Sequence, residues 1–300
     1  MVEYCGRNEI FVTKSWMEAL NLNSSYLIYE NSYKGSTIKA SFWVKQILNF
    51  KIIKCPPFTP YNVQILHDWN TSSSLGRYNN EVHLLLELKQ QLIGFAQVQL
   101  KLYPDILHAP IAFGSDYSFQ YTLSCRILKE QNEDSLWKMI PSSTRNHILN
   151  AQEELTVEIK SEFCSETLNF LVSDNFYSLE GLTTIKLKAI EQLLGGMQHI
   201  KIISCKNRYG KLVSTSIFIK SESTWYYWIN VNSKTERSRG APSVLLWEGI
   251  RIALNDSCEF VFDGSMQPRL MKTFKKFSAE SFTYCYAKAN QSFVFRTLNI

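Results

Sequence analysis

The chain has 300 residues, of which 45% are hydrophobic and 20% are charged, and its formal net charge is +5. This composition predicts a folded protein with one large domain or two of ordinary size, and it excludes long disordered stretches. The sequence contains no long run of like charges, which excludes the concentrated basic stripe or tail of a strong DNA binder.

The sequence also bears on the cellular compartment. Seven cysteines are scattered singly, without a CxxC pair, as is typical of reduced thiols in the cytosol. The N-terminus, MVEYCGRNEIF, lacks the basic-then-apolar build of a signal peptide. No stretch approaches the ~18 consecutive apolar residues that a membrane span requires. We therefore expect a cytoplasmic protein with no membrane span.

The first half of the chain predicts mixed α and β structure. Its strands are indicated by β-branched and aromatic residues, and three prolines mark a loop because proline blocks ladder hydrogen bonds. The expected elements are a helix at 14–20, a strand at 26–29, a hairpin at 36–45 and 47–54, the proline-rich loop at 56–61, a helix at 81–89, and strands at 94–101 and 119–124.

The second half begins with helices, continues with an antiparallel meander and ends with a loop, a helix and a strand. Strands and helices do not alternate throughout, which excludes a doubly wound nucleotide-binding fold. The expected elements are a helix at 136–152, a strand at 155–160, helices at 162–174 and 183–194, strands at 200–206, 212–219 and 225–231, a helix at 243–254, a strand at 260–262, a helix at 268–277 and a closing strand at 282–287.

Several short motifs occur in a fixed order in this second half. They are WYYW at 225–228, RSRGAP at 237–242, LLWEGI at 245–250, FDGSM at 262–266 and FKKF at 274–277. The PPFTPY loop at 56–61 and the YT pair at 121–122 agree with them. The ordered set resembles the Fem-like branch of the GNAT superfamily of acyltransferases, including the group found in bacterial envelope-polysaccharide clusters.

The resemblance implies an α/β (α+β) fold with tandem GNAT-like domains, each a mixed, mostly antiparallel twisted sheet flanked by helices. We place the N-terminal GNAT-like domain at 1–130 and the C-terminal acyltransferase domain at 131–300.

A basic loop before the helix at 243–254 is the candidate donor-binding site. Free N–H groups and the dipole at a helix start attract anions, and a glycine there can adopt positive φ and let a phosphate approach closely. The candidate residues are Lys234, Arg237, Arg239, Gly240 and Ala241. The resemblance assigns this loop to the coenzyme A pyrophosphate, although Pro242 removes one N–H donor. The alternative is a solvated basic turn before a buried helix.

The candidate catalytic residues of the same half lie within the strand at 225–231, directly after the strand at 260–262 and on the helix at 268–277. Asp263 could orient or deprotonate an acceptor amine, and Ser265 could donate to an oxyanion, or both could simply cap a turn. Lys275 matches a Fem lysine near the acyl group, or it is a solvated lysine. Adjacent strand residues face opposite ways, so one of Tyr226 and Tyr227 is expected to line the groove as a general acid.

The expected function is N-acyl transfer from an acyl-CoA such as acetyl-CoA to an amine of a cell-envelope sugar or peptide precursor, a small or nucleotide-linked acceptor. The alternatives are a Fem-type aminoacyl transfer from tRNA and a non-catalytic relative that binds a glycan precursor or a partner. The five histidines lack metal-ligand spacing, and no GxSxG, GxxxxGK[ST] or GxGxxG motif occurs at the required place. No metal is therefore expected.

Overall fold

The computed structural model describes residues 10–20, 25–68, 73–173, 188–189, 199–236, 238, 240–263 and 268–298. The chain forms two compact units, and each is described by itself. We call Glu9–Thr122 with Thr283–Ile300 the first unit, and Leu123–Phe282 the second unit. The boundary predicted near residue 130 assigns the closing strand to the second half, whereas the contacts of residues 283–300 assign them to the first unit.

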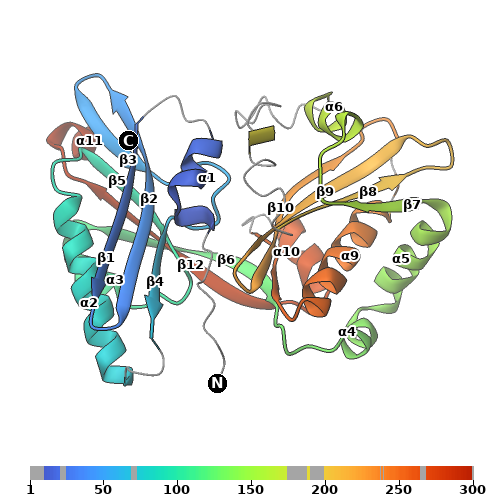
Figure 1. Ribbon diagram of the computed structural model, residues 1–300, viewed down its shortest axis with the longest axis horizontal. Coiled ribbons are helices and arrows are strands. Elements are labelled where there is room, and N and C mark those ends of the chain that lie inside the picture. The colour runs from blue at the N-terminus through green and yellow to red at the C-terminus, as the bar shows by residue number, and fades with distance from the viewer. Residues whose placement is uncertain are drawn as a thin grey trace. The chain divides into compact units, whose positions relative to one another are not determined.

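The first unit is built on a mixed sheet with strand order β1-β2-β3-β5-β12, to which β4 adds by pairing with β2 and β5. Figure 1 shows α2 and α3 on one face of this sheet. The elements are a 3-10 turn (Ile10–Val12), α1 (Lys14–Ala19), β1 (Tyr26–Tyr33), β2 (Ser36–Ile47), β3 (Phe50–Lys54), β4 (Val63–His67), α2 (Ser74–Gln91), β5 (Gln97–Leu102), α3 (Ala109–Phe113), a second 3-10 turn (Gly114–Asp116), β12 (Glu280–Asn290) and α11 (Phe293–Leu298).

The second unit has the strand order β6-β11-β10-β9-β8-β7. Helix α9 packs across the strands on one face, with α5 beside it, and α6 lies on the opposite face (Figure 1). The elements are β6 (Ser118–Ile127), α4 (Glu133–Met139), α5 (Ser142–Glu154), β7 (Thr156–Lys160), α6 (Ser165–Ser173), β8 (Ile200–Lys206), β9 (Leu212–Ser221), β10 (Thr224–Asn232), α9 (Ala241–Asn255), β11 (Glu259–Val261) and α10 (Pro268–Lys275).

The two sheets share one pairing order. In each, an antiparallel meander is followed by one parallel pairing, β3 with β5 or β10 with β11, and then by one antiparallel strand. The closing strand of the second unit, β6, comes before the other elements of that unit in the chain. The closing strand of the first unit, β12, comes after the other elements of the second unit. The predicted fold class, mixed and mostly antiparallel sheet structure flanked by helices in each unit, is confirmed.

Each unit has its own hydrophobic core. In the second unit the core joins α9 to the sheet through fully buried side chains such as Leu245, Ile250 and Phe260. In the first unit the core joins α2 to the sheet through Leu84, Leu88 and others. Burial of a Leu or Ile side chain stabilises by about 1.5–3 kcal/mol, so these two helices are held mainly by packing.

Several predicted elements differ in their bounds. The single helix predicted at 136–152 is two helices, α4 and α5, because Pro141 cannot continue α4. Helix α2 begins at Ser74, seven residues before the predicted start at 81, since Ser73 caps it by accepting the Gly76 N–H. β4, α3 and α11 were not predicted. The helix predicted at 183–194 lies outside the described residues except for 188–189. None of the described helices is long and apolar enough to cross a membrane.

Candidate functional site

The central feature of the second unit is the place where β10 leaves β11. The parallel ladder joins Thr224–Tyr226 to Glu259–Val261 and stops there, while β10 continues to Asn232. On its other side β10 pairs with β9, and the register passes from Tyr227 opposite Phe218 to Ile229 opposite Ile217. Trp228 is therefore an extra residue in a β-bulge. Bulges of this kind re-aim side chains and are common beside active sites.

The first unit closes the corresponding place with its own chain. There the strand parallel to β5 is broken into β3 and β4 by the proline-rich loop, and both parts pair with β5. Asn62, just before β4, donates its backbone N–H to the Lys101 carbonyl at 2.9 Å, and its side-chain Oδ1 accepts the Lys101 N–H at 2.7 Å. Among the described residues, no strand occupies this position in the second unit. The opening therefore belongs to the second unit.

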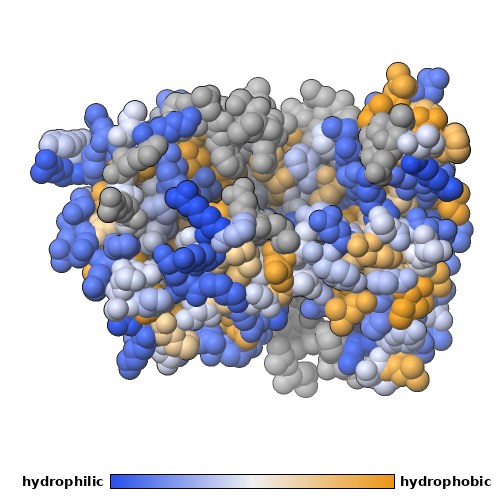
Figure 2. Space-filling view, turned by 180° about the vertical axis from the view of Figure 1, so that it is seen from behind, coloured by the Kyte–Doolittle hydropathy of each residue, from blue (hydrophilic) through white to orange (hydrophobic). Residues whose placement is uncertain are grey.

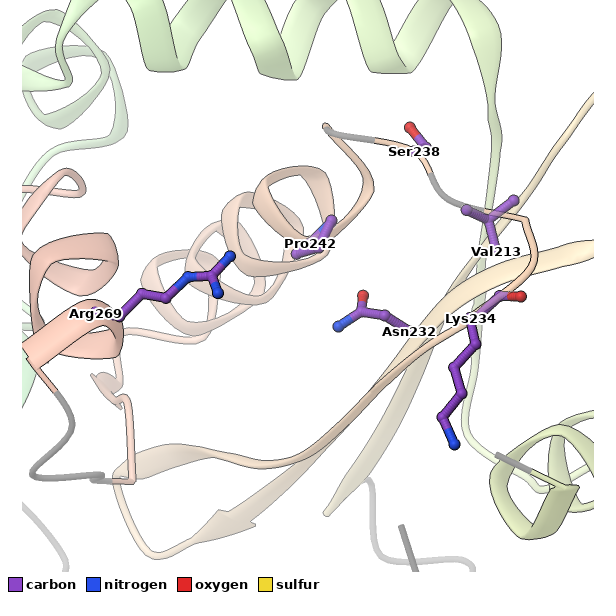
Figure 3. Close-up of a pocket in the computed structure, with 7 residues that line it drawn as sticks. Val213, Asn232, Lys234, Ser238, Pro242 and Arg269 are labelled. Atoms are coloured by element: carbon purple, nitrogen blue, oxygen red, sulfur yellow. The ribbon is translucent and has the colours of Figure 1, made fainter. Parts of the chain in front are cut away.

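A pocket of about 450 Å³ lies where β10 ends, at Asn232. Its volume is within the range of small-molecule sites. The lining residues come from β9, the end of β10, the loop before α9, the first turn of α9 and the start of α10. They are Val213, Asn232, Ser233, Lys234, Ser238, Pro242 and Arg269. In Figure 3 the guanidinium group of Arg269 points towards Pro242, and the amine of Lys234 points away from both.

Polar side chains run along β9 and β10 towards this pocket. Asn232 accepts a hydrogen bond from the Ser214 hydroxyl at 2.6 Å and donates to Asn230 at 2.8 Å. Asn230 in turn donates to the Ser216 hydroxyl at 2.9 Å. Because these side chains hydrogen-bond to one another, they form a preorganised row of polar groups along β9 and β10.

Gly240 has a different role from the predicted one. Its φ is −93°, so the positive φ that we expected of this glycine is not used. Instead, a β-carbon at Gly240 would stand 2.5 Å from the His147 carbonyl oxygen on α5, and it would also collide with the Ala151 side chain. Glycine is required here by close helix packing. Ala241, the next candidate, is fully buried.

The start of α9 offers few free backbone donors. Pro242 has no N–H, and the amides of Ser243 and Val244 both donate to the Gly240 carbonyl at 3.0 Å. Any anion at this helix start must therefore find its partners mainly among cationic side chains. Lys234 lines the pocket. Arg237 and Arg239 lie outside the described residues.

The two tyrosines of β10 are both largely enclosed. Tyr226 is 2% exposed, and Tyr227 packs against the core of the second unit, with its ring centroid 5.6 Å from that of Phe218 and 6.3 Å from that of Phe274. Burial raises the pKa of Tyr227 well above its ordinary value, although a hydrogen bond with Ser216 lowers the pKa in part. A phenol in this setting stays protonated at neutral pH.

Of the remaining candidates, the structure describes Asp263, after β11, and Lys275, on α10. Asp263 is half-buried and follows Phe262, whose N–H donates to the Cys125 carbonyl at 3.0 Å. Ser265 lies outside the described residues. Lys275 ends α10, and its ammonium group donates to the Ala279 carbonyl at 2.9 Å. A lysine at this position is stabilised by the helix dipole, so Lys275 has a structural contact in addition to the predicted role.

Arg269 is the cationic residue of the pocket that sequence reasoning missed. It lies in the first turn of α10, and Lys272 and Lys276 follow it at the helical spacing i, i+3 and i+7, all three being exposed. The segment 268–277 contains no acidic residue. This spacing is visible in the sequence, but the resemblance to the Fem segment predicts Lys275 instead.

Comparison of the whole chain with solved structures identifies the fold. FemX matches with a TM-score of 0.68 at 11% identity, over 96% of this chain and 94% of that one. The chain shares the fold of FemX. Other structures with this Fem-like fold are a conserved protein of unknown function from Bacteroides thetaiotaomicron (TM-score 0.59, 12% identity, 95% and 92% covered) and L-PGS from Bacillus licheniformis (0.56, 12%, 94% and 88%).

The sequence comparisons add nothing to the Fem-like fold: no family model and no curated protein matches the chain. Within the described residues, no group of three or more His, Cys, Asp or Glu side chains is arranged to hold a metal ion.

Proposed function

We propose that this protein transfers an acyl or aminoacyl group from a phosphate-bearing donor to an amine of a cell-envelope sugar or peptide precursor. The observation that carries the proposal is the pocket at the end of β10, lined by Lys234 and Arg269, in a chain that shares its fold with FemX over nearly its whole length. The pocket lies at the Asn232 end of β10, beyond the stretch that pairs with β11, so a donor bound there can extend along the free side of β10.

The cations of the pocket suit phosphate. Arg269 has no acidic partner among the described residues, and a guanidinium group can bind phosphate through two parallel N–H donors. Pro242 and the occupied amides of α9 leave the backbone a minor part in this binding. Arg269 therefore replaces donors that the helix start lacks.

The reaction is an attack of the acceptor nitrogen on the acyl carbonyl carbon. The new C–N bond forms as the C–S bond of a thioester, or the C–O bond of an aminoacyl ester, breaks. Asp263, at the end of β11, is assigned to take the proton that the amine loses. The leaving thiolate or ribose oxygen takes a proton from a β10 tyrosine, and Tyr227, whose pKa is raised by burial, is protonated at neutral pH. The protein's main contribution is to hold both reactants in place.

An acyl-CoA, such as acetyl-CoA, is the first donor candidate. The pocket volume of about 450 Å³ suits part of such a molecule. The modest net charge of +5 also suits a donor of a few phosphates better than a long polynucleotide.

Aminoacyl-tRNA is the second donor candidate, and the basic face of α10 favours it. Arg269 and Lys272 on α10, with Lys276 directly after it, are exposed cations near one another in the chain, so successive phosphates of a 3′-terminal strand can bind them. The resemblance of the sequence to the Fem branch points to the same donor.

Calorimetry with acetyl-CoA and with charged tRNA tests the proposal and separates the donors. We expect Arg269→Gln to weaken binding of the true donor by about tenfold, the loss of one charge-assisted contact, and the exposed Lys138→Gln on α4 to leave it unchanged. Lys272→Gln with Lys276→Gln should weaken tRNA binding and spare acetyl-CoA. Binding of neither donor contradicts acyl transfer and leaves a non-catalytic protein that binds a glycan precursor or a partner.

A further inference from the structure

One end of the first unit brings together three segments that are distant in the sequence. The tip of the β2–β3 hairpin is closed by the pairing of Ile47 with Phe50. Next to it, the Ala96 N–H donates to the Lys51 carbonyl at 2.8 Å, so the turn between α2 and β5 lies beside the start of β3. The Gln291 N–H donates to the Ala96 carbonyl at 2.9 Å, which brings the end of β12 and the start of α11 to the same place.

This end exposes large apolar side chains from all three segments. They are Leu48 (83% exposed) and Ile47 (41%) at the hairpin tip, Ile93 (64%) in the turn, and Phe293 (80%) and Val294 (41%) on α11. We call these five residues the apolar tip. Figure 2 shows hydrophobic side chains gathered at the upper right, over the hairpin and α11, with hydrophilic ones among them.

The packing of the first unit does not depend on these exposed side chains. Helix α11 is anchored by Phe295, which is 4% exposed and has its ring 5.5 Å from that of Phe50, so Phe293 and Val294 are not needed for its packing. Leu48 has a φ of 54°, a left-handed conformation that a bulky residue rarely adopts. An exposed leucine held in such a conformation raises the free energy of the folded state, and a role in binding explains why it is there.

The surroundings of the apolar tip are positively charged. The segments 44–54, 88–101 and 283–300 contain no aspartate or glutamate. Around the tip they carry Lys45 and Lys51 on the hairpin, with Arg296 on α11. Asp116, from outside these segments, is already paired with Lys89 at 2.7 Å.

We propose that the apolar tip inserts into the surface of an anionic phospholipid bilayer. Leucine, isoleucine and phenylalanine side chains enter the boundary between headgroups and acyl chains, and the surrounding lysines and arginine bind lipid phosphates. A second copy of the chain is a poorer occupant, because its tip would bring the same positive charges together. The apolar tip lies in the first unit, and the proposal that it binds membranes does not depend on the proposed acyl transfer.

Co-sedimentation of the full chain with vesicles tests the proposal. We expect binding to vesicles of phosphatidylglycerol mixed with phosphatidylcholine, and weak binding to phosphatidylcholine alone. Leu48→Ser with Phe293→Ser should weaken binding more than about tenfold through lost apolar burial, and Lys45→Gln with Lys51→Gln about tenfold through lost lipid attraction. Melting curves should show that both variants are as stable as the parent, since all four side chains are exposed or half-exposed.

Matched controls lie elsewhere on the molecule. Leu75→Ser with Leu107→Ser removes two side chains that are 68% and 70% exposed, and Lys14→Gln with Lys138→Gln removes two exposed charges. These variants should bind as the parent does. Equal binding to neutral vesicles, equal losses in the controls, or no vesicle binding would each overturn the proposal. So would self-association in sedimentation velocity that the Leu48→Ser and Phe293→Ser pair abolishes, because the tip would then be a contact between copies.

Discussion

Gly240 at the start of α9 lies so close to His147 on α5 that a β-carbon there would stand 2.5 Å from the His147 carbonyl oxygen. We therefore expect Gly240→Ala to force the two helices apart. Overpacking of this kind costs about 1–3 kcal/mol of unfolding free energy. Urea denaturation checks it, with Ser243→Ala in the same helical turn as the control. Equal stability of Gly240→Ala and the parent would contradict the packing role of Gly240.

The proline-rich loop is held by a buried hydrogen bond. The Trp16 indole N–H donates to the Thr59 hydroxyl at 3.0 Å, and both residues are largely or fully buried. Thr59→Val should lower the unfolding free energy by about 1–3 kcal/mol, because it leaves the indole donor without a partner. Thr59→Ser keeps the hydroxyl and should lose less.

A double-mutant cycle measures this contact directly. In a Trp16→Phe background the indole donor is absent, so Thr59→Val should cost clearly less than it does in the parent. The same cost in both backgrounds would show that the hydroxyl acts through its other bond, to the Pro57 carbonyl at 3.2 Å.

Asp256 should make stability depend on pH. Its burial raises its pKa, but hydrogen bonds from Lys220 (2.9 Å) and Trp225 (3.0 Å) lower it more, so the net pKa lies below the ordinary value. The stabilisation is therefore fully present above the unfolded pKa of about 3.9 and is lost as pH falls through the folded pKa. Asp256→Asn should cost about 1 kcal/mol at neutral pH, since the pair is partly exposed.

Melting temperatures of the parent and of Asp256→Asn, compared from pH 7 to below pH 3, check this expectation. The gap should close at acid pH, whereas Glu153→Gln, an exposed change on α5, should show no comparable gap. A gap that persists unchanged in acid would mean that the asparagine disturbs packing.

Cys164 should be more reactive than the buried cysteines. Its partial burial raises its pKa, but hydrogen bonds from the Thr167 hydroxyl and backbone, with the charge of Lys160, lower it more. Burial raises the pKa of Cys205 to about 12 and also raises those of Cys125, Cys258 and Cys285. Iodoacetamide at neutral pH should therefore label Cys164 before these four, as mass spectrometry would show. Thr167→Val should slow the labelling of Cys164, because it removes the hydroxyl that lowers the pKa of this thiol.

The sequence predicted the fold well where local pattern and tertiary packing agree. The β2–β3 hairpin and the meander β8–β10 follow from β-branched and aromatic runs bounded by turn residues. The break at Pro141 was missed because apolar residues continue across it. β4 was missed because its short apolar run follows a loop and pairs with strands far away in the chain.

The candidate site was predicted in part. The loop before α9 was found from its charge, and Lys234 does line the pocket. The reason for Gly240 was wrong, because its requirement comes from α5, about ninety residues earlier in the chain, and no local pattern reports such a contact. Arg269 was missed for a similar cause: it lines the pocket together with the end of β10 and the first turn of α9, and only the folded chain brings these segments together.

The closing strand of the first unit, β12, follows the second unit in the chain, and this order has a consequence for synthesis on the ribosome. β5 pairs with β12 along Gln97–Leu102, and β12 emerges only after the whole second unit has been made. Until then the nascent first unit presents the backbone of β5 as an open edge, where a chaperone or another nascent chain can pair. The second unit has no such delay, because β6 leaves the ribosome before the strands it joins. Folding is therefore expected to finish at the N-terminal half, the part that was translated first.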